Sequence, residues 1–228
     1  MSRALVLDDP AAAAAERIAL AASAGGHVAL AGGSTPRAAY ERLAGMDVDW
    51  SRCTLWFGDE RCVPADDERS NYGMVRAALL DRLDGDGPAV RRMAGELGPE
   101  RGAEAYTHEL ESQFGPGMPA LDLVLLGIGP DAHCASLFPG QPALDERERP
   151  VVGVAHAGLP PFVARITLTL PAINAAREVV FLVAGAAKAD AAARAFGAPP
   201  DPTAPASLVA PTSGSLTVLL DREAAGRG

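Results

Sequence analysis

The chain has 228 residues, 48% of them hydrophobic, and a formal net charge of -9 at pH 7. This length and apolar content can form one substantial core, so we expect a single domain over residues 1–228. The acidic charge argues against general binding to nucleic acids or anionic membranes, because the average surface field repels both. No apolar stretch reaches the roughly 20 residues that a membrane span needs, and residues 1–10 carry acids rather than a basic leader. We therefore expect a cytoplasmic protein.

The cysteines argue against disulfides and a zinc site, and the rare Lys and Asn residues mark positions of interest. Cys53, Cys62 and Cys134 are odd in number and form no C-x-x-C pair, which suits reduced thiols better than disulfides or a zinc site. We expect no metal, and a monomer is favoured, although nothing in the sequence sets the oligomeric state. In a chain rich in Ala, Arg, Gly and Pro, Lys occurs only at position 188 and Asn only at positions 71 and 174. The frequent residues have GC-rich codons, and we interpret these three residues as positions that have resisted this codon bias.

The first half of the chain alternates apolar strands with helices. An Ala-rich segment that ends at Gly25 predicts a helix, and a glycine turn that leads into Pro36 predicts the start of a second one. Tyr40 and Leu43 should lie on the buried face of that second helix. The expected elements are a helix over 11–24, a strand over 27–31, a helix with Pro36 in its first turn, a strand over 54–57, and helices over 71–83 and 100–114.

The second half continues the alternation. We expect strands over 121–128, 165–170, 179–183 and 216–220, a polar loop over 129–140 and a helix over 188–196. Apolar strands that alternate with helices indicate an α/β fold, with a mostly parallel sheet covered on both faces. Ligands bind beyond the carboxyl ends of such strands. The loops that begin at Gly32, Gly58 and Gly127 all leave carboxyl ends, so their polar residues should converge on one crevice.

The turn Gly32-Gly33-Ser34-Thr35 is a candidate phosphate site. It places backbone N–H groups and two hydroxyls at the start of a helix, where the donors are unpaired and the helix dipole favours anions. The alternative is an ordinary helix cap by Ser34 or Thr35 that binds no ligand.

The loop over 129–140 is the candidate catalytic segment. A buried strand delivers Asp131 and His133 into it, and a carboxylate beside an imidazole fixes the tautomer and raises the basicity that a general base needs. The alternative, a structural histidine, suits His27, His108 and His156 better.

Two other interpretations of this loop are weaker. The pattern Gly127-x-Gly129-x-x-Ala132 matches a dinucleotide fingerprint, but Pro130 removes an amide and Asp131 would repel a pyrophosphate. Cys134 could be a nucleophile. Adjacent residues on an extended loop tend to point apart, so packing is the preferred role for its thiol.

Three basic residues are further candidates. Arg61, in the segment Asp59-Glu60-Arg61 beyond a strand end, could either hold a carboxylate as structure or offer its guanidinium to an oxyanion. Arg165 opens a strand and Lys188 opens a helix, and such residues are usually solvated. Lys188 is the exception because it follows a buried strand and is the only lysine.

Five strings now become informative together: AGGSTP at 31–36, WFGDERCVP at 56–64, SNYGM at 70–74, LLGIGPDAHCASLFPG at 125–140 and RITLTLPAIN at 165–174. In order and across nearly the whole chain, they resemble the 6-phosphogluconolactonase family of the glucosamine-6-phosphate isomerase/6-phosphogluconolactonase superfamily. The resemblance implies a Rossmann-like three-layer α/β/α sandwich. It also implies hydrolysis of a phosphosugar lactone, 6-phospho-D-glucono-1,5-lactone, in the oxidative pentose phosphate pathway, with no cofactor.

The resemblance assigns roles position by position. His133 resembles the general base, Asp131 its orienting acid, and Arg61 the cation near the reacting carbonyl. The candidate catalytic residues are His133, Asp131, Arg61 and Asp59, and the candidate phosphate-binding residues are Gly32, Gly33, Ser34, Thr35, Arg165 and Lys188. The chain departs from the family's usual Gly and Thr at Ala132 and Cys134. If position 132 has a positive φ, alanine costs about 1 kcal/mol there.

Two alternative functions follow from the same residues. Aminosugar-phosphate deaminases of the superfamily resemble the glycine turn and the histidine loop, but they usually show Asp-Glu-Tyr in place of Asp59-Glu60-Arg61. They also carry a glutamate soon after the loop histidine, where this chain has Ala135-Ser136-Leu137-Phe138. A non-catalytic sugar-phosphate sensor is the second alternative, and the presence of all four candidate catalytic residues argues against it.

Overall fold

A computed structural model describes residues 2–85 and 87–226 of the chain. Its centre is a sheet of seven parallel strands in the order β1-β10-β9-β6-β2-β3-β5. The strands are β1 (Ser2–Val6), β2 (His27–Leu30), β3 (Thr54–Phe57), β5 (Ala89–Val90), β6 (Leu123–Leu126), β9 (Glu178–Val183) and β10 (Ser215–Leu220). The expected parallel α/β sheet is confirmed.

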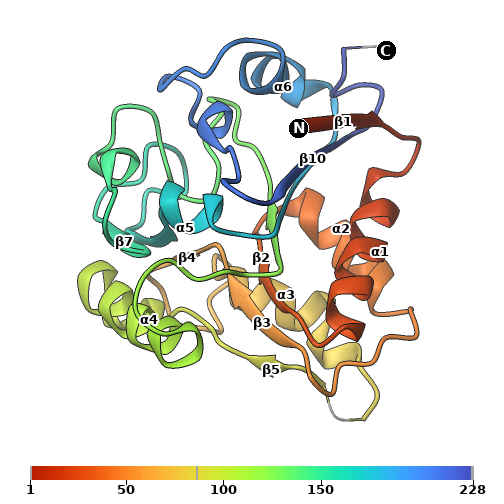
Figure 1. Cartoon of the computed structure of the whole chain (residues 1–228), viewed down its shortest axis with the longest axis vertical. Helices are drawn as coiled ribbons and strands as arrows, with labels where there is room; N and C mark the ends of the chain where they lie inside the picture. The colour runs from red at the N-terminus through yellow and green to blue at the C-terminus, as the bar shows by residue number, and fades with distance from the viewer. Residues whose placement is uncertain (1, 86, 227–228) are drawn as a thin grey trace.

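Helices and a second, smaller sheet cover the two faces. The helices are α1 (Pro10–Ser23), α2 (Ser34–Leu43), α3 (Asn71–Ala78), α4 (Pro99–Phe114), α5 (Leu170–Asn174) and α6 (Ala189–Phe196). Figure 1 shows α1 and α2 to the right of the central sheet and α4 with β7 to its left. The strand order explains this arrangement. The chain moves one way along the sheet from β1 to β5 and then back to β10, and right-handed crossovers in opposite directions place their helices on opposite faces. The result is the expected three-layer sandwich.

The smaller sheet departs from the sequence expectation. It consists of β4 (Asp59–Arg61), β8 (Arg165–Leu168) and β7 (Val151–Val154), and its strands are antiparallel. Asp59-Glu60-Arg61 is therefore a strand, not a loop. The strand expected over 165–170 ends at Leu168, because α5 begins at Leu170 with Pro171 in its first turn. The helix expected over 71–83 stops at Ala78 and is followed by a 3₁₀ turn.

Two buried tyrosines fix the strand ends from which the site is built. The Tyr40 hydroxyl donates to the carbonyl of Ala31 at 2.8 Å and accepts from its N–H at 2.9 Å, just beyond the end of β2. The Tyr106 hydroxyl accepts from the N–H of Phe57, at the end of β3, at 2.8 Å. Buried backbone groups that leave a ladder need such partners. The chain therefore leaves both strands at fixed points and enters the turns at Gly32 and Gly58.

Within the described residues, no helix combines the length and the apolar character that a membrane crossing requires.

Candidate active site

The segments that leave β2, β3 and β6 meet at one cavity of about 340 Å³. Its polar lining brings together the side chains of Asp59, Arg61, His133, Arg165 and Lys188 with the glycines of the turn after β2. A second cavity of about 130 Å³ shares Gly32, Gly33 and Lys188 with it and adds Ser34 and Thr35. The two cavities therefore form one continuous site at the carboxyl ends of the parallel strands.

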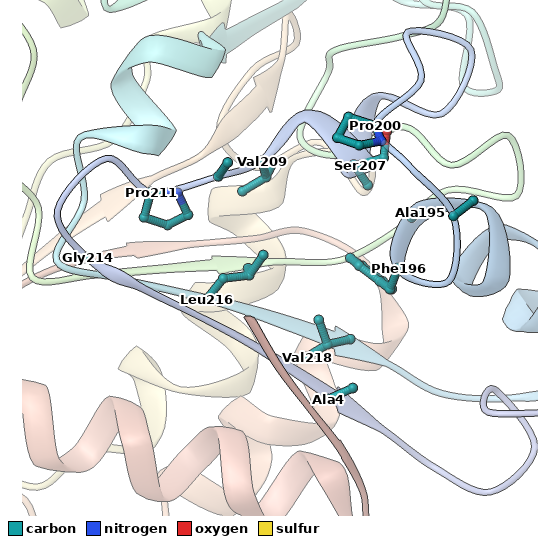
Figure 2. Close-up of a pocket in the computed structure, with 13 residues that line it drawn as sticks. Ala4, Ala195, Phe196, Pro200, Ser207, Val209, Pro211, Gly214, Leu216 and Val218 are labelled. Carbon is teal, nitrogen blue, oxygen red and sulfur yellow. The ribbon is translucent and has the colours of Figure 1, made fainter. Parts of the chain in front are cut away.

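A larger cavity, of about 560 Å³, lies elsewhere, between β1, β10, α6 and the segment 205–214. Figure 2 shows Phe196, Leu216 and Val218 facing this space from α6 and β10. All its lining residues are uncharged, and Ser207 is the one with a polar side chain. It therefore offers no acid, base or cation, and we place the chemistry at the cavity that holds His133.

His133 and Asp131 form a hydrogen-bonded pair on the loop after β6. The Nδ1 of His133 lies 2.5 Å from Oδ1 of Asp131, and the same oxygen accepts the backbone N–H of His133 at 3.1 Å. An ionised carboxylate only accepts hydrogen bonds, so in the neutral form of the imidazole Nδ1 carries the proton and Nε2 keeps its lone pair. Burial raises the pKa of Asp131, but the hydrogen bond and charge of His133 outweigh it, and the net pKa is lowered. The pair is arranged as a base with an orienting carboxylate.

The backbone of this loop is tightly turned. Gly129 donates to the carbonyl of His133 at 2.9 Å, and a Cβ on Gly129 would lie 2.0 Å from the His133 Nδ1. Ala132 has a φ of 66°, in the left-handed region that favours glycine, where alanine costs about 1 kcal/mol. Ala206 donates its N–H to the carbonyl of Ala132 at 2.9 Å, which ties the loop to the segment beside the cavity of Figure 2.

Arg61 and Arg165 face each other across β4 and β8. Arg61 donates from Nη1 to the carbonyl of Arg69 at 2.6 Å, while its buried Nε has no hydrogen-bond partner among the described residues. Arg61 lines the same cavity as His133, which favours the oxyanion role over the structural one. The buried Arg165 donates to the carbonyls of Pro161 and Val163, and its pKa is lowered by burial.

The glycine turn leaves its amide donors open. The helix α2 begins at Ser34, with Pro36 in its first turn as expected, with Gly33 as N-cap at a φ of 100° and with no capping side chain. The alternative of a cap by Ser34 or Thr35 is therefore not what the structure shows. Lys188 borders both cavities, and burial lowers its pKa while the charge of Asp131 partly offsets that effect. Of the two connected cavities, Arg165 borders only the one that holds His133, so the structure does not bring it to the Ser34-Thr35 turn.

This geometry can be compared with known proteins. The family model described as "Glucosamine-6-phosphate isomerases/6-phosphogluconolactonase" matches residues 4–218. The chain belongs to this family.

Similar members of the glucosamine-6-phosphate isomerase/6-phosphogluconolactonase family include two proteins named 6-phosphogluconolactonase. The one from Synechocystis is 41% identical over 90% of this chain and 86% of its own length. The one from Homo sapiens is 41% identical over 94% of this chain and 82% of its own. A solved structure of the 6-phosphogluconolactonase from Trypanosoma brucei superposes with a TM-score of 0.86 at 30% identity, covering 99% of this chain and 98% of that one.

Cys134, which stands where the family usually has Thr, is buried beside His133. The Cys134 side chain is 1% exposed, and burial raises the pKa of its thiol to about 12, so it packs as expected and is no nucleophile at neutral pH. Among the described residues, no group of three or more His, Cys, Asp or Glu could hold a metal ion.

Sequence reasoning missed two buried residues behind the cavity wall, Asn71 and Ser136. Both hydrogen-bond to the carboxylate of Asp59. The rarity of asparagine singled out Asn71, although without a role. Nothing in the sequence singled out Ser136, because the strand that holds Asp59 is 77 residues away.

Proposed function

We propose that this chain hydrolyses 6-phospho-D-glucono-1,5-lactone to 6-phospho-D-gluconate, a step of the oxidative pentose phosphate pathway. The observation that carries the proposal is the His133–Asp131 pair in one cavity with Arg61 and Lys188. Base, oxyanion donor and phosphate cation are the three groups that this reaction needs. The names and the coverage of the related proteins support the same reading.

In the proposed mechanism, the free Nε2 of His133 takes a proton from a water molecule as that water attacks C1 of the lactone. Arg61 stabilises the tetrahedral oxyanion, which a guanidinium suits because its N–H groups are fixed in direction. When the C1–O5 bond breaks, protonated His133 returns its proton to the departing ring oxygen. Asp131 stabilises the imidazolium and does not itself take the proton. General base catalysis contributes about 10²- to 10⁴-fold, which suits an ester already prone to hydrolysis.

We place the substrate phosphate in the smaller cavity, between the N-terminus of α2 and Lys188. The cavity volume of about 130 Å³ suits a phosphate group, and its lining supplies the open amides of the glycine turn with the hydroxyls of Ser34 and Thr35. A chain with a net charge of -9 repels a dianion, so Lys188 has to offset that field locally. Arg165 adds positive charge from the neighbouring cavity that holds His133.

The aminosugar-phosphate deaminase alternative requires a carboxylate soon after the loop histidine. Residues 135–138 supply none, and the nearby carboxylate of Asp59 already accepts hydrogen bonds from two buried side chains. The solved structure of a glucosamine-6-phosphate deaminase is 21% identical to this chain, and that likeness supports the fold only.

The direct test is lactone hydrolysis by the purified chain, followed against the spontaneous rate in buffer. A rate well above the spontaneous one supports the enzyme, and a chain that binds 6-phosphogluconate without accelerating hydrolysis would be the sensor. We further propose a monomeric, cytoplasmic protein, and sedimentation of the purified chain tests the first of these two properties.

A further inference from the structure

A buried hydrogen-bond network centres on the carboxylate of Asp59, at the wall of the cavity that holds His133. Asp59 is 6% exposed. Its Oδ2 accepts from the Ser136 hydroxyl at 2.7 Å, and its Oδ1 accepts from the Asn71 side-chain amide at 3.0 Å. Nη1 of Arg165 lies 4.0 Å from the same Oδ2. Both oxygens thus have fixed partners, an arrangement that suits an anchor better than a proton carrier.

Asn71 makes this anchor rigid from the side of the glycine turn. Its side chain is 1% exposed and donates also to the backbone carbonyl of Asp59 at 2.8 Å. A Cβ on Gly32 would lie 1.9 Å from the Asn71 Oδ1, so the turn packs directly on this amide. α3 and the glycine turn therefore support the position of Asp59 from the side opposite to the loop residue Ser136.

Ser136 connects that loop to the anchor. It lies in a tight turn in which Leu137 donates to the carbonyl of Cys134 at 3.0 Å and Ala135 has a φ of 48°. Ser136 is fully buried, and its N–H donates to the Thr167 hydroxyl at 3.1 Å while its own hydroxyl reaches Asp59. The turn begins one residue after His133. A shift of Ser136 would therefore be passed directly to the histidine.

We propose that Ser136 is a positioning residue for the hydrolysis, acting through its hydrogen bond to Asp59. It does not line the cavity, so it has no contact with substrate. Its hydroxyl holds the His133 loop in register with Arg61, which shares β4 with Asp59. Ground-state binding of the phosphate depends on the cavity of about 130 Å³ at the glycine turn, which Ser136 does not line. Loss of the Ser136 hydroxyl should therefore reduce kcat and leave KM nearly unchanged.

The experiment uses Ser136→Ala with Ser70→Ala as its matched control. Ser70 is also a buried serine, and its hydroxyl donates at 3.0 Å to the carboxylate of Glu60, the residue beside Asp59 on β4. Successive side chains of a strand point to opposite faces, and Glu60 does not line the cavity. We expect Ser136→Ala to lower kcat about 10- to 100-fold, as misplacement of a catalytic group does, with KM within about twofold. Ser70 also caps α3 by accepting the N–H of Gly73, so Ser70→Ala should lower the melting temperature, while its kcat loss should be clearly smaller than that of Ser136→Ala.

A double-mutant cycle separates positioning through Asp59 from a general packing defect. In an Asp59→Ala background the Ser136 hydroxyl has lost its partner, so adding Ser136→Ala should change kcat by less than about twofold. Equal kcat losses in Ser136→Ala and Ser70→Ala, or a Ser136→Ala effect that persists fully in the Asp59→Ala background, would overturn the proposal.

If Ser136→Ala does not fold, Ser136→Cys keeps the size of the side chain with a weaker donor. It should then lower kcat by a smaller factor, and wild-type kcat in that variant would equally overturn the proposal. The inference rests on the proposed lactone hydrolysis, whose own failure would appear separately, as no catalysis by the wild-type chain.

Discussion

The glycine turn after β2 and the histidine loop after β6 leave neighbouring parallel strands, yet they are held in place by different means. The backbone of the turn is set mainly by local structure: α2 starts at Ser34 and supplies the open amides, and the Tyr40 hydroxyl fixes the strand end just before it, while Asn71 of α3 packs on Gly32. The loop depends on distant contacts, since Asp59 holds it through Ser136 and Ala206 holds it through Ala132. The amides proposed to bind the phosphate thus come from the backbone of one turn, and Lys188 adds the cation. A base needs support from several parts of the chain, and mutations should separate the two.

The largest effect should come from the loop. His133→Ala should lower kcat by at least about 10²-fold with little change in KM or in the melting temperature, because it removes the base and leaves the phosphate site intact. Steady-state hydrolysis measures kcat and KM, and a thermal melt measures the melting temperature. Turnover near the wild-type rate would show that His133 is not the base.

The proposed phosphate site, which Lys188 shares with the glycine turn, should respond in the opposite way. Lys188→Ala should raise KM for the phosphorylated lactone much more than it lowers kcat, the signature of lost uniform binding. Weak hydrolysis of the unphosphorylated lactone is the control, and it should hardly change because there is no phosphate for Lys188 to meet. Equal losses on the two substrates would mean that Lys188 supports the fold or the chemistry, and that the phosphate site lies elsewhere.

A smaller effect should follow from relieving the strain in the loop. In Ala132→Gly, relief of the left-handed φ gains about 1 kcal/mol. Greater backbone freedom in the unfolded chain and the loss of a buried methyl group cost a similar amount. We expect a free energy of unfolding within about 1 kcal/mol of wild type in denaturant titrations, and kcat within about twofold. A large loss of either would show that the alanine methyl group itself holds the loop.

No effect at all should come from metal removal. The proposed mechanism uses protein groups only, so activity after dialysis against EDTA should equal that of the untreated protein. Loss of activity with EDTA, together with recovery on adding one divalent ion, would contradict the metal-free mechanism.

The same contrast between local and distant structure explains how much the sequence could predict. The strand over 54–57 was predicted with its observed bounds, because a continuous apolar run between polar segments is a local signal. The strand β4 was missed because Asp59-Glu60-Arg61 carries no apolar residue, and its pairing with β8 joins segments about 100 residues apart. The convergence of Asp59 and His133 with the glycine turn followed from the rule for parallel strand ends, whereas Lys188 was placed there by the family resemblance. The anchoring of Ser136 by Asp59 follows from no such rule, because only the folded chain brings them together.

The hydrogen bond from Ala206 to the carbonyl of Ala132 makes one backbone amide a reporter of the loop. This N–H belongs to a segment about 70 residues further along the chain, so it is shielded only while the loop stays closed against that segment. Its deuterium uptake should therefore follow loop opening in the resting protein, with no substrate present and no label on the histidine. Because Ala206 also borders the uncharged cavity between α6 and β10, the same amide would register any change of packing there.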